Sequence, residues 1–189
     1  MRIAIFGGTF NPIHKGHMFL AKQAKKTLKL DKVVFVPAYI PPHKSSQGII
    51  DADKRFHMIE LAISGKPNFT VSRYEIDKKK KVYSVETAAH FKKVFPKGTQ
   101  LFFLTGADSL KGLDKWKDAD KFFDLCEFVV FSRPGFGLGT KELRIRAIEI
   151  NALDVSSTQV RARIKKDKSI TDLVPKLVAD YIKHKRLYR

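Results

Sequence analysis

The chain has 189 residues, which is enough for one sizeable hydrophobic core, and one domain is the expected organisation. Its apolar content of 43% is ordinary for a globular protein, and no apolar run approaches the ~18–20 residues of a membrane span. Lys and Arg number 37 against 19 Asp and Glu, and the resulting net charge of +18 favours polyanionic ligands, whether nucleic acid, membrane surface or nucleotide phosphates.

Short apolar segments alternate with helical patterns along most of the chain. Helices are expected at 17–29, 52–64, 84–94 and 118–125. The expected strands are rich in β-branched or aromatic residues and are bounded by Gly, Pro or charge; they are 2–6, 32–38, 69–76, 99–107, 127–133 and 146–150. This alternation predicts an α/β fold, a Rossmann-like, doubly wound parallel sheet with helices on both faces.

After residue 155 the pattern becomes helical, in "SSTQVRARIKK" and "LVPKLVADYIKHK". Because no repeat, low-complexity tract or linker divides the chain, we expect a single domain over 1–189, with a sheet core in 1–150 and a helical part in 155–189. The single cysteine, Cys126, excludes an internal disulfide and a multi-cysteine metal site. The N-terminus lacks the long apolar region of a secretory signal, so a reducing cytoplasm is the expected location.

The first strand-to-helix turn, "GGTFNPIHKGH" (7–17), is suited to binding phosphate. Ligands of parallel α/β sheets bind at the carboxyl ends of the strands. Gly7 and Gly8 have no Cβ, so a phosphate or ribose can approach the backbone there. The helix that follows from about Gly16 offers unpaired N–H groups and a positive dipole end to an anion, with His14 and His17 beside it.

Two other interpretations of these histidines remain. They can be metal ligands, although a zinc site needs about three protein ligands and no nearby Cys or carboxylate completes one. They can also be loop histidines without a special role. The turn itself is neither a Walker loop, because no Gly-Lys-Ser/Thr follows, nor a GxGxxG fingerprint.

The turn resembles the GxFxPxHxGH signature of the nucleotidyltransferase superfamily, whose members transfer AMP or CMP onto a phosphate. A second signature of that superfamily, (I/V)SSTxxR, is similar to "VSSTQVR" (155–161). Ser and Thr at a helix start satisfy unpaired N–H groups, and an arginine one turn later adds charge-assisted hydrogen bonds. The chain therefore carries two candidate phosphate-binding helix starts.

Further blocks narrow the resemblance to the bacterial nicotinate (or nicotinamide) mononucleotide adenylyltransferases. They are "VPAYIPPHK" (36–44), "DADKRFHMIELAI" (51–63), "YSVETAAHF" (83–91), "LTGADSLKGLDKW" (104–116) and "VVFSRPG" (129–135), and they run in the order of that family. One departure is Ala88, where the family usually has Leu. The segment "GFGLG" (135–139) is typical of a loop here, since no suitable helix follows it.

The resemblance implies three sets of site residues. The catalytic set is His14, His17, Lys44 and Arg161. The ATP-binding set is Gly7, Gly8, Thr9, Phe10, His17, Gly106, Asp108, Ser156, Ser157, Thr158 and Arg161. The mononucleotide-binding set is Lys44, Thr87, Trp116 and Arg133, and no protein metal ligand is implied. Without the family, Trp116 would be read as a core aromatic residue and Asp108 as a helix cap.

The implied reaction joins AMP from ATP to nicotinate mononucleotide and gives nicotinate adenine dinucleotide, a precursor of NAD, and pyrophosphate. The second pKa of a phosphate is around 6, so the acceptor is already largely dianionic at pH 7 and needs no general base. The protein would supply positioning and positive charge, with Mg²⁺ arriving on ATP, its cofactor. Nucleic acid and membrane are not expected partners, and the sequence leaves the oligomeric state open, a homo-oligomer included.

Two alternatives remain at this point. A phosphopantetheine adenylyltransferase or a cytidylyltransferase would share the histidine turn and the serine-rich helix start, but the "PPHK" and "SRPG" segments count against both. A nucleic-acid-binding module would explain the charge of +18 directly, yet it would not explain two phosphate loops on a parallel sheet.

Overall fold

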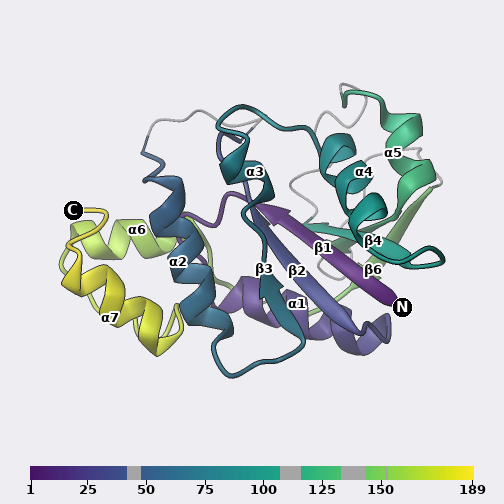
Figure 1. The fold of residues 1–189 in the computed structure, drawn as a ribbon. Helices are drawn as coiled ribbons and strands as arrows, with labels where there is room; N and C mark the ends of the chain where they lie inside the picture. Colours follow the sequence, from purple (N-terminus) through teal and green to yellow (C-terminus); the bar gives the residue numbers. More distant parts are fainter. Residues whose placement is uncertain (42–47, 107–115, 133–143, 152) are drawn as a thin grey trace.

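The structure is a computed structural model that describes residues 1–41, 48–106, 116–132, 144–151 and 153–189 (Figure 1). Its centre is a six-stranded sheet in the order β3-β2-β1-β4-β5-β6, and every neighbouring pair is parallel. The strands are β1 (Arg2–Gly8), β2 (Lys32–Pro37), β3 (Phe69–Val71), β4 (Gln100–Gly106), β5 (Glu127–Ser132) and β6 (Ile145–Glu149). The predicted parallel α/β sheet is confirmed.

Helices connect the strands and form the C-terminal part of the chain. They are α1 (Lys15–Thr27), α2 (Ala52–Ile63), α3 (Tyr74–Asp77), α4 (Ser84–Val94), α5 (Ala119–Leu125), α6 (Ser157–Lys165) and α7 (Lys176–His184). The sheet changes direction at its middle, because β1 has β2 on one side and β4 on the other. At such a reversal the connecting helices lie on opposite faces and a crevice opens at the carboxyl ends of the strands.

The four central strands, β2, β1, β4 and β5, bury side chains on both faces, as their nearly continuous apolar sequences predict. Phe6, Phe35 and Leu104 belong to one core, together with residues of α1, α2, α6 and α7. Ile5, Val36 and Phe103 belong to a second core, which α4 and α5 complete. Figure 1 shows α2, α6 and α7 on one side of the sheet and α4 and α5 on the other. The predicted helices on both faces are confirmed.

The prediction of a strand over 69–76 is wrong beyond Val71. The strand ends there, and Tyr74–Asp77 forms the short helix α3 instead. The alternating sequence "FTVSRYEI" is typical of a strand, but Glu75 and Ile76 are both buried and Glu75 bonds to a residue of α4. Tertiary contacts of α3 therefore override the local pattern.

Candidate active site

The turn after β1 lies at the carboxyl edge of the sheet, where the strand order reverses. The helix α1 begins at Lys15, two residues earlier than predicted, because His14 is its N-cap. The Nδ1 atom of His14 accepts a hydrogen bond from the His17 N–H (3.3 Å), and Nδ1 of His17 accepts one from the His14 N–H (3.2 Å). The two imidazole rings stack with their centroids 3.6 Å apart. This reciprocal cap fixes both rings at the start of α1.

The tautomer of the two rings follows from these bonds. Since Nδ1 of each ring accepts a hydrogen bond, a neutral ring carries its proton on Nε2. His14 is buried, and burial lowers its pKa to about 4. Burial therefore disfavours the charged form of His14, and its catalytic role stays a prediction. His14 is a neutral donor through Nε2–H at pH 7.

The glycines of the turn make room for aromatic rings. A Cβ on Gly8 would lie 2.9 Å from Cζ of Phe10, and one on Gly16 would lie 2.9 Å from Nδ1 of His14. The Phe10 ring is buried and packs against Phe6 and Phe35, with centroid distances of 5.5 and 5.7 Å. The ring of Phe10 is thus part of the core, and only its main chain can border ATP. The roles of the glycines toward ATP stay predictions.

The start of α6 lies against the same turn, although it comes more than 140 residues later. Ser156 caps α6 by accepting a hydrogen bond from the Gln159 N–H (3.1 Å). The Ser157 hydroxyl donates to the Pro12 carbonyl (2.9 Å). Arg161 donates to the Asn11 carbonyl (2.8 Å) and to the Thr158 hydroxyl (3.2 Å). The N-terminal turn of α6 therefore lies against the turn that leads into α1, which brings two helix N-termini to the same edge of the sheet.

A second group of predicted residues lies on the other face of the sheet. The Thr87 hydroxyl is fully buried in α4 and donates to Oε1 of Glu75 at 2.7 Å. Burial, chiefly, raises the pKa of Glu75 to about 7. The Thr87 side chain therefore faces Glu75 and is not exposed to a ligand. Glu75 was missed by sequence analysis because the predicted strand gave no reason to bury it.

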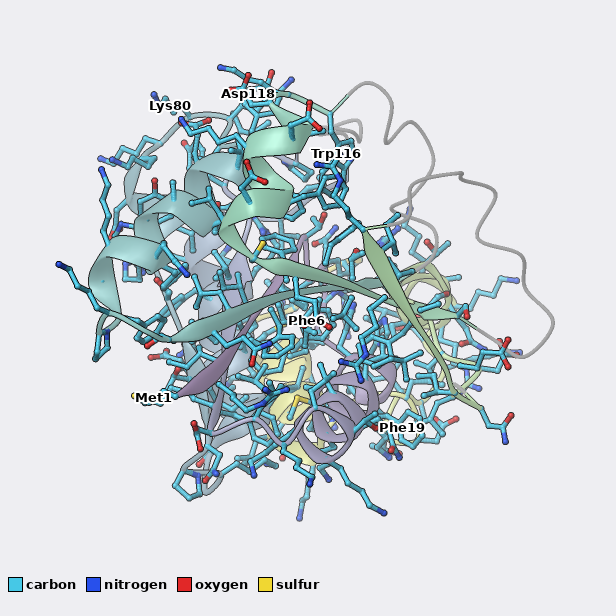
Figure 2. All side chains as sticks on the ribbon, turned by 90° about the vertical axis from the view of Figure 1, so that its right-hand side faces the viewer. Met1, Phe6, Phe19, Lys80, Trp116 and Asp118 are labelled. Carbon is cyan, nitrogen blue, oxygen red and sulfur yellow. The ribbon has the colours of Figure 1, made fainter. Side chains whose placement is uncertain are left out.

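Trp116 stands just before α5, beside Asp118 (Figure 2). Its ring lies 5.5 Å from the ring of Phe122 and 5.3 Å from that of Phe128, and the residue is half-buried. The contacts fit the core-aromatic interpretation. Its role as a platform for the pyridine ring stays a prediction.

The remaining predicted residues are either at the sheet edge or not described. Gly106 ends β4, next to β1, and a Cβ on it would meet nothing within 4 Å. Thr9 follows β1 directly, and its carbonyl accepts a hydrogen bond from Arg55. Lys44, Asp108, Arg133 and the segment 135–139 lie outside the described residues.

The described residues contain no group of three His, Cys, Asp or Glu side chains that could hold a metal ion. In particular, no described carboxylate or thiol lies with His14 and His17 to form a zinc site. In the same part of the chain, no helix is both long and apolar enough to cross a membrane.

The sequence and the fold were compared with known proteins. Residues 5–163 match the model of the cytidylyltransferase-like family. The chain is 43% identical over 197 residues to a protein of Clostridium tetani described as a probable nicotinate-nucleotide adenylyltransferase, with 98% of each chain covered. A protein of Thermus thermophilus with the same description is 39% identical over 189 residues, with 100% of each chain covered.

Among solved structures, the fold is similar to that of the nicotinic acid mononucleotide adenylyltransferase of Plasmodium falciparum, solved in complex with NaAD. The TM-score is 0.78 at 20% sequence identity, and the match covers 99% of this chain and 97% of that one. At this identity the match shows a common fold.

Proposed function

The chain belongs to the nicotinate-nucleotide adenylyltransferase family of the cytidylyltransferase-like proteins, and from this we propose that it transfers AMP from ATP to the phosphate of nicotinate mononucleotide. The products are nicotinate adenine dinucleotide and pyrophosphate. The observation that best supports the proposal is the meeting of the α1 and α6 N-termini at one turn, with His14 and Arg161 both bonded into it.

The reaction is a displacement at the α-phosphorus of ATP. An oxygen of the acceptor phosphate forms the new bond to this phosphorus, the bond from the α-phosphorus to the bridging oxygen breaks, and pyrophosphate leaves with the electron pair. The acceptor phosphate has a second pKa around 6, so it is largely dianionic at pH 7 and needs no base. What the protein must overcome is the repulsion between two anions and the charge that develops around the α-phosphate.

The residues of the turn supply positioning and hydrogen-bond donors. His14 offers a neutral Nε2–H, fixed in direction by the reciprocal cap with His17. A fixed donor stabilises developing charge without first having to reorient. Arg161 adds a full positive charge, and two of its five N–H groups already hold Asn11 and Thr158 in place. We expect its other donors to bind the triphosphate.

We propose that the substrate is ATP with its bound Mg²⁺, which neutralises phosphate charge and accompanies the leaving pyrophosphate. The described residues provide no carboxylate cluster of their own for the ion. Mg²⁺ is commonly bound by one or two carboxylates plus substrate phosphates, so a site dominated by ATP oxygens fits this protein. A cytoplasmic location, and binding without nucleic acid or membrane, stay predictions.

The test is a coupled assay of pyrophosphate release with ATP, Mg²⁺ and one acceptor at a time. The acceptors are nicotinate mononucleotide, nicotinamide mononucleotide and phosphopantetheine, with CTP replacing ATP in a parallel series. Rapid release with ATP and nicotinate mononucleotide is expected. Release with CTP or phosphopantetheine, without release with either pyridine nucleotide, would contradict the proposal.

A further inference from the structure

Arg55, on α2, is the most deeply buried arginine among the described residues, with 1% of its surface exposed. Arginines are almost never fully buried unless their charge is paired. Here the hydrogen bonds go to three main-chain carbonyls: Nη1 donates to Thr9 (2.8 Å), Nη2 to Tyr39 (3.1 Å) and Nε to Ile50 (3.0 Å). Three main-chain partners satisfy much of the planar guanidinium fork, and no described carboxylate hydrogen-bonds to it. Burial lowers the pKa of Arg55, and the nearby charge of Asp51 opposes this shift.

The three carbonyls belong to different segments at the carboxyl edge of the sheet. Thr9 follows β1 in the histidine turn, Tyr39 follows β2, and Ile50 precedes α2. A core residue that served only to hold α2 on the sheet would contact apolar neighbours, as Met58 of the same helix does. Arg55 instead ties the turn to the two ends of the β2–α2 connection.

The bond to Thr9 also fixes the direction of a main-chain donor. The carbonyl of Thr9 and the N–H of Phe10 belong to one planar trans peptide and point in opposite directions. When Arg55 holds the carbonyl, the Phe10 N–H is directed away from α2. Within the described ranges no residue accepts this N–H. Such a donor is suited to a phosphate oxygen.

The turn is fixed in the same way at two further carbonyls. Arg161 holds that of Asn11 and Ser157 that of Pro12, both from α6. Side chains from two helices therefore bind three of four successive carbonyls and set the orientation of the peptide planes between them. Of the three side chains that bind carbonyls of the turn, Arg55 is the one from α2. It lies outside both the histidine turn signature and the serine-rich signature of α6.

We propose that Arg55 is a positioning residue for ATP, which presets the main chain of the turn through its bond to the Thr9 carbonyl. Arg55 does not contact the substrate. The proposal rests on the proposed function in placing ATP at the turn, but it concerns ATP binding alone and does not depend on the identity of the acceptor.

The experiment measures the Kd for ATP–Mg²⁺ by calorimetry, without acceptor, for the wild type, Arg55→Lys and Arg55→Ala. Lys keeps the charge but cannot bond three carbonyls in one plane, so the Kd of Arg55→Lys should rise about tenfold. The Kd of Arg55→Ala should rise further. Met58→Ala is the matched control, since it removes a fully buried side chain from the same helix. It should lower the Tm and leave the Kd within about twofold of the wild type.

Chemical rescue distinguishes a positioning role of Arg55 from a purely structural one, because only the former predicts that added guanidinium restores ATP binding. Guanidinium at millimolar concentration should lower the Kd of Arg55→Ala toward that of the wild type and leave that of Met58→Ala unchanged. An unchanged Kd in folded Arg55→Lys would overturn the proposal, and this variant answers the question even if Arg55→Ala does not fold. A wild type that binds ATP but releases no pyrophosphate with any acceptor would contradict the proposed function and leave the Arg55 measurement valid.

Discussion

Arg161 of α6 donates a hydrogen bond to the carbonyl of Asn11, 150 positions earlier in the chain, at 2.8 Å. The bond connects the helical C-terminal part to the turn after β1 and places a positive charge there. Because the acceptor belongs to the protein's own main chain, the bond orients the guanidinium toward the turn. Preorganisation of this kind reduces the entropy that binding has to overcome.

Arg161→Lys should raise the KM for ATP by about tenfold and leave the KM for the acceptor within about twofold. Lys keeps the charge but loses the planar fork that now spans Asn11 and Thr158. Arg163→Lys is the control, because Arg163 lies on the same helix and forms an exposed ion pair with Asp172. Steady-state kinetics with each substrate varied in turn gives the result, and an unchanged KM for ATP would assign Arg161 to the basic surface.

His14→Ala and His17→Ala should each lower kcat by roughly 10²–10³, the usual effect of removing one preorganised donor. The KM for the mononucleotide should change little, since the effect is on charge that develops in the transition state. His184→Ala, at the exposed end of α7, is the control and should keep the wild-type kcat. Either turn variant with near-normal kcat would remove that histidine from the mechanism.

Glu75→Gln should alter how stability depends on pH. The pKa of Glu75 is about 7 in the folded protein, mainly through burial, against 4.5 when unfolded. Between these values the folded state binds more protons, so the contribution of Glu75 to the free energy of unfolding falls as pH rises from 4.5 to 7. Gln does not titrate. The Tm of Glu75→Gln relative to the wild type should therefore increase between pH 5 and pH 8.

The matched control for this experiment is Glu149→Gln, an exposed carboxylate on the edge strand β6. Its Tm difference from the wild type should stay nearly constant over the same range. A Glu75→Gln difference that does not grow with pH would mean that Glu75 is ionised in the folded state throughout.

The sheet could be predicted almost completely from the sequence, because β1, β2, β4 and β5 are short apolar runs with most of their side chains buried. The edge strand β6 has no buried residue, but its sequence mixes apolar and charged residues. The exception is 69–76. Apolar and polar residues do alternate there, but the Tyr74 ring stacks on that of His90 of α4 with the centroids 3.8 Å apart, and Glu75 accepts a hydrogen bond from Thr87. Contacts distant in sequence therefore decide the local structure. A pattern within eight residues contains no information about those partners.

The site was predictable where its chemistry sits in continuous signatures, as in the histidine turn and the start of α6. It was not predictable where function depends on burial. Burial disfavours the charged form of His14, and the Phe10 ring lies in the core, so only the main chain of Phe10 is left to border ATP. Arg55 lies in the block 51–63 that carries part of the resemblance, but its burial was not predictable, since an arginine in an amphipathic helix is usually exposed. Such environments are set by three-dimensional packing.

The measurement that tests the central claim most directly is a competition experiment with ATP and Mg²⁺. Nicotinate and nicotinamide mononucleotides are supplied at equal concentration, and the dinucleotide products are separated by mass. The two acceptors differ only in a carboxylate against an amide. The net charge of +18 would favour the carboxylate. The N–H groups of Glu86 and Thr87 already donate to the Tyr83 carbonyl, so we expect the carboxylate to meet other N–H donors, against which an amide would bring a donor against a donor.

Such a mismatch costs about 1–3 kcal/mol, or roughly 5- to 150-fold, and within this range we expect kcat/KM to be at least about tenfold higher for the nicotinate form. The product ratio in the competition reports this ratio directly. We expect nicotinate adenine dinucleotide to exceed the amide product by that factor at one fixed salt concentration. Equal amounts of the two dinucleotides would contradict the predicted selectivity, and the absence of both would contradict the assignment of the chain as a pyridine nucleotide adenylyltransferase.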